Sequence, residues 1–135
     1  MTTSPQFHMV AGAPAPVAPF SHACESDGWV FITGQLPIDP GNESAPLPDG
    51  IELQTKKTFD NLRIVLNGLG LELRDVVSAR AFLTHFHEDY ERFNTVYATY
   101  FPDGQFPART CIGVTGLARY ARVEIDMIAR RPALL

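Results

Sequence analysis

Two segments of the sequence repeat apolar residues at the spacing of an α-helix, and the other structured segments are typical of short β-strands. The helices are predicted over residues 53–70 and 88–101. Their apolar faces consist of Phe59, Leu62, Leu66 and Leu69 in the first, and Tyr90, Phe93, Tyr97 and Tyr100 in the second. Two helices that alternate with strands favour an α/β or α+β two-layer sandwich, in which one sheet carries both helices on one face.

The predicted strands cover residues 21–25, 29–33, 76–82, 108–115 and 121–129, most of them rich in β-branched and aromatic residues. The first two strands form a hairpin, and the last two are expected to form another across residues 116–120. Residues 39–50 are dense in turn formers and are predicted to be a loop. Residues 1–13 are predicted to form an extended N-terminal arm, and residues 14–135 a single domain.

A sheet with only two helices leaves its second face uncovered, and that face must be polar or covered by another subunit. The predicted strands offer few polar residues for it. Their apolar residues include Val30, Ile32, Val77, Ala79, Ala81, Val123, Ile125 and Met127. We therefore expect an oligomer.

Composition and charge exclude several classes of function. The 11 Lys and Arg against 15 Asp and Glu give a net charge of -4, without a basic stripe for nucleic acid or an anionic membrane. No apolar run reaches the ~18 residues that a membrane span needs. The N-terminus lacks the pattern of a secretory signal, and two cysteines make no disulfide framework. We expect a soluble, cytoplasmic protein.

The sequence contains none of the motifs GxGxxG, GxxxxGK[ST], HExxH, CxxC and GxSxG. His85 and His87 are the best metal candidates, but no carboxylate or thiol cluster accompanies them, which favours a solvated loop over a metal site. A nucleophile made of a cysteine and a histidine is a further formal possibility. Nothing near Cys111 in the sequence would lower the pKa of its thiol, so a role in lining a pocket is favoured.

Arg109 and Glu124 lie in the last two predicted strands. Glu124 alternates with Val123 and Ile125, which are expected to face the core, so its carboxylate points to the opposite face of the sheet. From spacing alone, the simpler interpretation of Glu124 is an outward-facing strand residue. The simpler interpretation of Arg109 is a surface charge at the end of a loop.

The residue order of several segments resembles the Rid family, the reactive intermediate deaminases formerly called YjgF. The resemblance covers residues 14–131, and its segments occur in family order. They are APFSHA at 18–23, FITGQLP at 31–37, TFDNL at 58–62, FNTVY at 93–97 with YFP at 100–102, and PARTCIGV at 107–114 with VEIDMIA at 123–129.

The resemblance implies a chorismate mutase-like α+β fold with one mixed sheet, and a homotrimer with a site in each cleft between subunits. It implies hydrolysis of enamines and imines of the 2-aminoacrylate type to 2-keto acids and ammonia, as in a 2-iminobutanoate/2-iminopropanoate deaminase. No cofactor or metal is implied. The family's substrate-binding arginine and its acidic residue, which we expect to be catalytic, fall on Arg109 and Glu124. Its other binding positions fall on Phe20, Thr33, Gly34, Asn94 and Cys111.

These residue types suit that reaction. A guanidinium presents parallel N–H donors that match the carboxylate of a 2-imino acid, which assigns Arg109 as the anchor. A carboxylate in a partly desolvated cleft can take a proton from water and later return it to the departing nitrogen, which assigns Glu124 as the acid–base group.

Three features depart from the family pattern. Phe20 replaces the usual tyrosine, Thr33 replaces the usual serine, and the stretch from Asn94 to Arg109 is shorter than in some members. The hydroxyl lost at Phe20 favours a more apolar substrate. Two alternatives therefore stay open: a pathway-specific deaminase of an aminoacrylate or an aromatic-derived enamine, and a non-catalytic trimer that binds small carboxylates.

Overall fold

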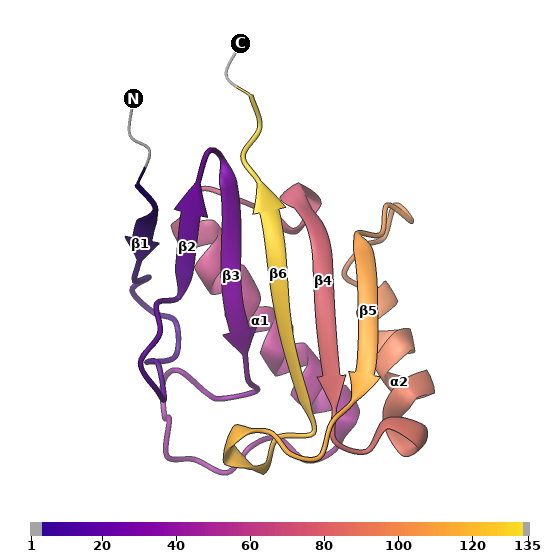
Figure 1. Cartoon of the computed structure of the whole chain (residues 1–135). Coiled ribbons are helices and arrows are strands. Elements are labelled where there is room, and N and C mark those ends of the chain that lie inside the picture. The colour runs from indigo at the N-terminus through magenta and orange to yellow at the C-terminus, as the bar shows by residue number, and fades with distance from the viewer. Residues whose placement is uncertain (1–3, 134–135) are drawn as a thin grey trace.

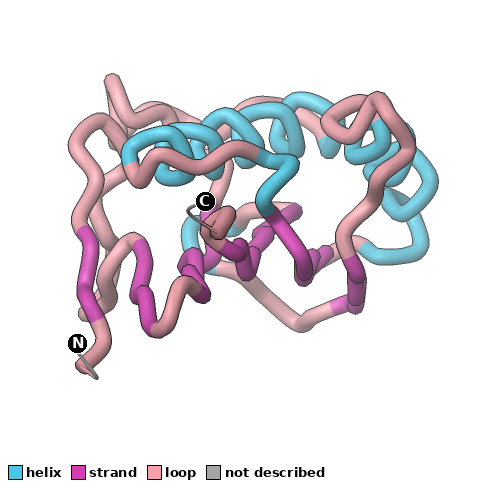
Figure 2. Tube along the Cα trace, turned by 90° about the horizontal axis from the view of Figure 1, so that it is seen from above, coloured by secondary structure: helices cyan, strands magenta, loops and turns pink. Residues whose placement is uncertain are grey.

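The structure, a computed structural model, describes residues 4–133 as one six-stranded sheet with two helices on one face (Figures 1 and 2). The strands are β1 (Gln6–His8), β2 (Ala23–Ser26), β3 (Trp29–Gln35), β4 (Val76–Leu83), β5 (Ala108–Gly113) and β6 (Val123–Arg130). The helices are α1 (Ile51–Gly68) and α2 (Phe86–Ala98), with 3-10 turns η1 (Leu73–Asp75) and η2 (Ala118–Tyr120). The predicted α+β sandwich with a mixed sheet is confirmed.

The strand order is β1-β2-β3-β6-β4-β5, and every pair is antiparallel except β4 with β5. The predicted hairpin between residues 108–115 and 121–129 is therefore wrong, because β4 lies between β5 and β6. The segment that connects β5 to β6 passes below β4. Its residue Arg119 donates hydrogen bonds to the carbonyl oxygens of Glu43 at 2.9 Å and Ala45 at 3.3 Å. These bonds tie the connection to the loop over residues 39–50.

The core lies between the sheet and the helices. Both helices place the predicted apolar stripe against the sheet, and Phe59, Leu62 and Phe93 are completely buried there. Both helices begin earlier than predicted. The solvated loop expected around His85 and His87 is largely the first turn of α2, which begins at Phe86.

The face of the sheet opposite the helices is uncovered in the single chain (Figure 2). The eight apolar strand residues expected to leave this face short of polar side chains are, except for Val77, buried in the core. Alternation along the strands instead places other apolar side chains on the uncovered face, with exposed fractions between 41% and 71%. They are Phe7, Trp29, Phe31, Val77 and Ile112.

Residues before β2 are fastened to the sheet at several points. β1 pairs antiparallel with β2. The buried His22 ring bridges two backbone groups of the preceding segment, with one nitrogen 2.8 Å from the Val10 amide nitrogen and the other 2.7 Å from the Pro14 carbonyl oxygen. This bridge positions the chain that leads into Phe20.

Candidate functional site

Arg109 points to the helix side of the sheet, into the space beside α2. Its register partner on β4 is Ala79, whose side chain is buried against the helices, and paired residues share a face. Its guanidinium carbon lies 4.8 Å from the ring centroid of Tyr97, 5.6 Å from that of Phe93 and 6.0 Å from that of Tyr90. Among residues 4–133, no hydrogen bond or ion pair engages this guanidinium, so its N–H donors are free for a ligand.

A cavity of about 260 Å³ opens next to this guanidinium. Its lining is mostly apolar and combines one cation with one amide, from residues Asn94, Tyr97, Ala98, Phe106, Pro107 and Arg109. Such a combination is typical of a pocket that orients a small anion with an apolar group attached. We call it the arginine pocket.

Cys111 lies on the same face of β5 as Arg109, two residues further along the strand. Its thiol is half-buried, and burial raises the pKa of that thiol while Arg109 lowers it by a smaller amount. A raised pKa leaves the sulfur protonated and weakly nucleophilic. The structure therefore favours a lining role over a nucleophilic one.

Glu124 lies on the opposite, uncovered face. Its neighbours Val123 and Ile125 are completely buried on the helix side, so the carboxylate projects the other way. Burial raises the pKa of the Glu124 carboxyl group, and the negative charge of Asp126 raises it further. A carboxylate with a raised pKa is a better general base than an ordinary surface glutamate.

Gly34 borders the Glu124 carboxylate near the end of β3. The register between β3 and β6 slips by one residue between Ile32 and Gln35, so a bulge brings this backbone close to β6. A Cβ atom at Gly34 would overlap the Glu124 carboxylate. The glycine thus makes room for the acid at this point.

The same face holds a hollow of about 570 Å³ that includes Phe20, Thr33 and Gly34 in its lining. At its wall, Arg80 binds Asp126 through two nitrogens, at 3.0 Å from Nε to Oδ1 and 2.7 Å from Nη2 to Oδ2. The hollow joins the Phe20 ring to the strand segment that carries the acid. We call this group, Phe20, Thr33, Gly34 and Glu124, the glutamate half-site.

The seven residues singled out in the sequence therefore fall into two groups on opposite faces of the sheet. Asn94, Arg109 and Cys111 belong to the arginine pocket or its border, and the rest to the glutamate half-site. No contact joins Arg109 to Glu124 within the described chain. Chemistry that needs both groups requires two copies of the chain.

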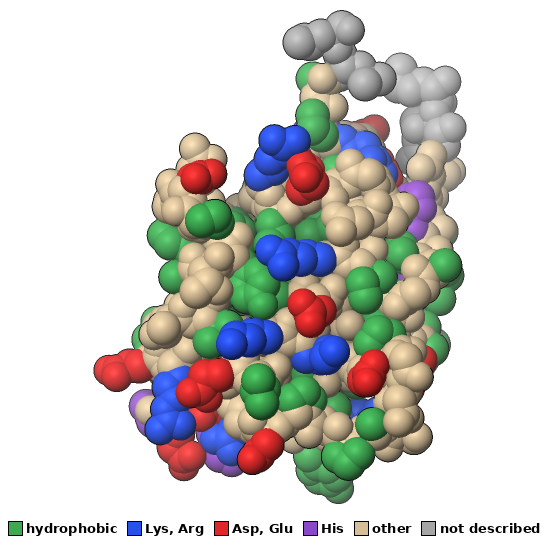
Figure 3. All heavy atoms as spheres, turned by 180° about the vertical axis from the view of Figure 1, so that it is seen from behind, with side chains coloured by type: hydrophobic (Ala, Val, Ile, Leu, Met, Phe, Trp, Pro, Cys, Tyr) green, Lys and Arg blue, Asp and Glu red, His purple; other side chains and the backbone are tan. Residues whose placement is uncertain are grey.

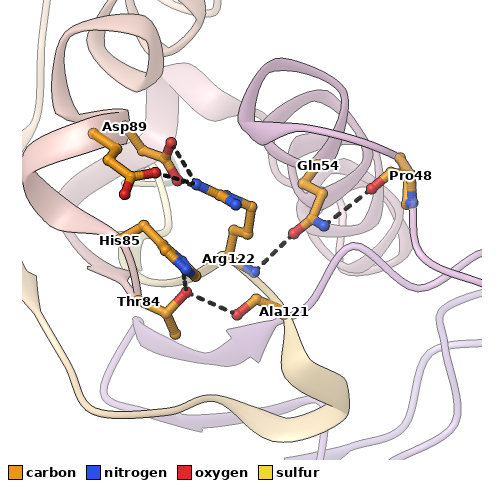
Figure 4. A network of polar contacts seen from close by, with 8 residues as sticks. Pro48, Gln54, Thr84, His85, Asp89, Ala121 and Arg122 are labelled. Carbon is orange, nitrogen blue, oxygen red and sulfur yellow. Dashed lines mark hydrogen bonds and ion pairs between the residues drawn. The ribbon is translucent and has the colours of Figure 1, made fainter.

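A polar network fixes the start of β6 just before Glu124 (Figure 4). Arg122 binds the buried Asp89 carboxylate through Nε at 2.8 Å and Nη2 at 2.9 Å, and its backbone N–H donates to Gln54 at 2.8 Å. Thr84 donates to the Ala121 carbonyl oxygen at 3.3 Å. Both helices and β4 thereby hold the strand that carries the acid.

Sequence reasoning missed the walls of both half-sites. Tyr97, Phe106 and Pro107 line the arginine pocket, and Arg80 with Asp126 lines the hollow near Glu124. The helical repeat that contains Tyr97 was a usable signal, because Asn94 lies one turn away on the same helix. No sequence signal placed Arg80 next to Asp126, because their contact joins strands far apart in the chain.

No group of three or more His, Cys, Asp or Glu side chains suited to a metal ion occurs in the part of the chain that the structure describes. His85 precedes α2 and contacts the Thr84 hydroxyl at 3.0 Å, whereas His87 lies within the helix. His85 and His87 therefore do not lie together on one loop. Within residues 4–133, no helix is long and apolar enough to cross a membrane.

Comparison with known proteins identifies similar sequences. A family model described as Endoribonuclease L-PSP matches residues 10–131. A protein of Synechocystis named RutC family protein is 35% identical over 122 residues, which cover 90% of this chain and 93% of that protein. A mouse protein named 2-iminobutanoate/2-iminopropanoate deaminase is 35% identical over 117 residues, which cover 87% of this chain and 84% of that protein.

The fold is shared with solved structures as well. A Yersinia pestis protein of unknown function, described as a member of the conserved Rid protein family, superposes with a TM-score of 0.88 and 31% sequence identity. The match covers 94% of this chain and 99% of that chain.

Proposed function

The chain belongs to the Endoribonuclease L-PSP family, to which the Rid, YjgF and RutC proteins are assigned, and from this premise we propose that it is a hydrolytic deaminase. Its substrates are reactive 2-imino acids and their enamine tautomers, and its products are 2-keto acids and ammonia. The name of the mouse relative supports this reaction class.

The observation that carries the proposal is the guanidinium of Arg109, which lies at a mostly apolar pocket and has no hydrogen-bond or ion-pair partner in the described part of the chain. A carboxylate accepts two parallel N–H bonds from a guanidinium, and this pairing gains strength where water is excluded. The cavity of about 260 Å³ suits a small acid and leaves an apolar wall for its side chain.

Glu124 supplies the acid–base chemistry. As a carboxylate it takes a proton from a water molecule while the water oxygen bonds to the imine carbon. From the iminium form of the substrate, this addition gives a neutral carbinolamine. The proton on Glu124 then passes to the nitrogen and the C–N bond breaks to release ammonia, while the hydroxyl proton passes to the Glu124 carboxylate as the carbonyl forms. An imine carbon is already electrophilic, so orientation plus a base that contributes on the order of 10²–10⁴-fold are sufficient.

We propose that the two half-sites meet between subunits of a homotrimer. The arginine pocket of one subunit, with Asn94 and Cys111, faces the glutamate half-site of its neighbour. The apolar side chains on the uncovered face, among them Trp29 and Phe31, supply surface for such an interface. In this arrangement Phe20 and Thr33 close the cleft over the substrate, and Gly34 leaves room for the acid.

The apolar walls favour a substrate with an apolar side chain. Phe106 and Pro107 line the arginine pocket, and Phe20 contributes a ring without a hydroxyl to the other half-site. This supports the alternative of a pathway-specific deaminase that acts on a larger enamine acid. The rates of hydrolysis of imines of increasing size distinguish a general 2-imino acid deaminase from this pathway-specific one.

An endoribonuclease activity, which the name of the family suggests, has little physical support in this chain. The net charge is -4, and acidic and basic side chains are interspersed over the helix side (Figure 3). Binding to a polyphosphate chain calls for a cluster or stripe of basic residues.

The test generates 2-iminopropanoate and bulkier imines in place, from an amino-acid oxidase, with semicarbazide as the competing trap. Wild type is expected to lower the yield of trapped product, and Arg109→Ala to have no effect. Glu124→Gln is expected to bind a 2-keto acid as tightly as wild type and to lose turnover.

Two results would overturn this proposal. If wild type accelerates no imine but binds keto acids, the protein is a carboxylate-binding member of the family. If Glu124→Gln keeps full turnover, another group activates the water.

A further inference from the structure

Two buried polar atoms next to Arg109 have no hydrogen-bond partner among the described residues. They are the Tyr97 hydroxyl and Oδ1 of Asn94, both on α2 and both from residues that line the arginine pocket. A buried polar atom without a partner costs stability, and each one in a folded protein calls for an explanation. Their position at the pocket points to a ligand.

Tyr97 is held rigidly. Its side chain is only 4% exposed, and its ring contacts Phe59, Phe93 and Phe101 at centroid distances of 5.6, 5.7 and 5.2 Å. The ring is therefore clamped from several sides and cannot turn its hydroxyl elsewhere at low cost. On the remaining side lies the guanidinium of Arg109, at 4.8 Å from the ring centroid.

A phenylalanine at position 97 would make the same cation–π contact with the Arg109 guanidinium and would not bury a hydroxyl without a partner. The cation–π attraction depends on the ring face, which both residues share. The Tyr97 hydroxyl therefore lowers the stability of the ligand-free protein and does not improve the packing of the ring. Burial raises the pKa of this hydroxyl, so it stays protonated and acts as a donor at neutral pH.

We propose that Tyr97 is a positioning and binding residue for the carboxylate: its ring supports Arg109, and its hydroxyl donates a hydrogen bond to the same carboxylate that Arg109 binds. Among residues 4–133, no hydrogen bond holds Arg109 over the ring, so its guanidinium can move toward a ligand and uncover the hydroxyl. The carboxylate then receives donors from two side chains on different elements, which fixes its orientation.

This inference rests on the proposed function only for the chemical class of the ligand. Its test is therefore an equilibrium measurement with 2-oxobutanoate, a stable keto acid of the product class, on the whole protein. Thermal melting is followed with and without this acid, because a ligand that binds the folded state raises the melting temperature according to its Kd.

Tyr97→Phe is expected to melt at the same temperature as wild type or higher without ligand. Its ligand-induced rise should be smaller and correspond to a Kd roughly 10- to 100-fold weaker, as expected for a lost hydrogen bond to a charged group. With an imine substrate, KM should rise while kcat changes less than about twofold, because such binding is shared by ground and transition states.

Tyr90→Phe is the matched control, since Tyr90 is on the same helix and its ring lies 6.0 Å from the Arg109 guanidinium carbon. Its Kd should equal that of wild type. A Tyr97→Phe variant that melts lower and keeps the wild-type Kd overturns the inference. So does a wild type that does not bind 2-oxobutanoate.

The two proposals fail separately. A protein that binds the keto acid through Tyr97 but accelerates no imine refutes the deaminase and leaves this inference standing. An active deaminase whose Kd and KM are unchanged in Tyr97→Phe keeps its function and loses the role of the hydroxyl.

Discussion

At the scale of the residue, the surroundings of Glu124 oppose the ionised form of its carboxyl group. Its carboxyl group is partly withdrawn from water and lies on the same strand face as Asp126, and both conditions disfavour the ionised form that a general base needs. Arg80 binds Asp126 and so reduces the repulsion on Glu124. The acid is thus poised to take up and release a proton, at a cost to stability.

The free energy needed to ionise Glu124 in the folded protein predicts how the stability of a Glu124→Gln variant, relative to wild type, depends on pH. The pKa of Glu124 is higher in the folded protein than in the unfolded chain, so ionisation disfavours folding. The penalty is absent below the unfolded pKa near 4.5 and is complete above the folded pKa. Glu124→Gln should therefore be more stable than wild type at pH 8, and the difference should shrink toward zero at pH 4. Urea unfolding at both pH values measures it, and a constant difference contradicts the prediction.

Gly34 provides a second prediction at this scale. Gly34→Ala places a methyl group against the Glu124 carboxylate, which must move aside because its side chain is the flexible partner. Since the backbone of Gly34 does not have a positive φ, folding should be nearly unaffected, within about 1 kcal/mol.

Turnover by Gly34→Ala should fall roughly 10- to 100-fold, because misplacement of a reacting group by about 1 Å is that costly. The matched control is Gly116→Ala, where a Cβ atom meets nothing within 4 Å. Equal activity of the two variants would show that the position of Glu124 is not limiting.

The chemical types of the site residues were predictable from the sequence, but their faces were only partly so. Alternation placed Glu124 opposite the core, and the structure confirms that orientation. For Arg109 the sequence of the short strand β5, ARTCIG, has no regular alternation of apolar and polar residues, so it does not indicate which face meets the helices. The register with β4 and the distances from its guanidinium to the rings of α2 show that Arg109 lies beside α2.

At the scale of the element, helices and strands were predictable because their periods are local. Strand neighbours were not, because hydrogen bonds between strands join residues that are distant in the chain. Residues 108–113 and 123–130 are consecutive strands, and consecutive strands pair in many folds, yet β4 separates them here. The bonds of Arg119 to Glu43 and Ala45, which hold the connection, have no local sequence signature.

The network at the start of β6 predicts a stability effect. Arg122→Ala leaves the Asp89 carboxylate, 2% exposed, without its partner. The expected loss is about 2–4 kcal/mol, or a melting temperature lower by roughly 5–15 °C. Arg122→Lys keeps the charge and loses the paired hydrogen bonds, so its loss should be smaller. Thermal unfolding followed by circular dichroism measures both losses. An Arg122→Ala variant with the melting temperature of wild type would show that water replaces the hydrogen bonds of Arg122 to the Asp89 carboxylate.

At the scale of the whole molecule, the sheet itself separates the two half-sites. The strand β5 forms one edge of the sheet (Figure 1). Arg109 on β5 lies on the covered face, and Glu124 on β6 lies on the uncovered face. Side chains of one sheet that point to opposite faces cannot reach one substrate together. The homotrimer proposed above would bring the two half-sites together and would cover the exposed apolar side chains of the uncovered face.

This arrangement predicts that two inactive variants restore each other. Arg109→Ala retains an intact glutamate half-site, and Glu124→Gln retains an intact arginine pocket. When subunits are separated in mild denaturant, mixed in equal amounts and reassembled, each half of a cleft is intact with a probability of one half. About one quarter of the clefts, one half times one half, should then be active in imine hydrolysis.

The controls define what this recovery means. Each variant treated alone should stay inactive, and the two mixed without dissociation should gain activity only as fast as subunits exchange. If mixed oligomers form, as shown by mass spectrometry of the intact assembly, and no activity returns, then Arg109 and Glu124 do not act across an interface. Recovery near one quarter shows that each cleft combines the guanidinium of one subunit with the carboxylate of its neighbour, because a cleft made from one chain would always contain one of the two defects.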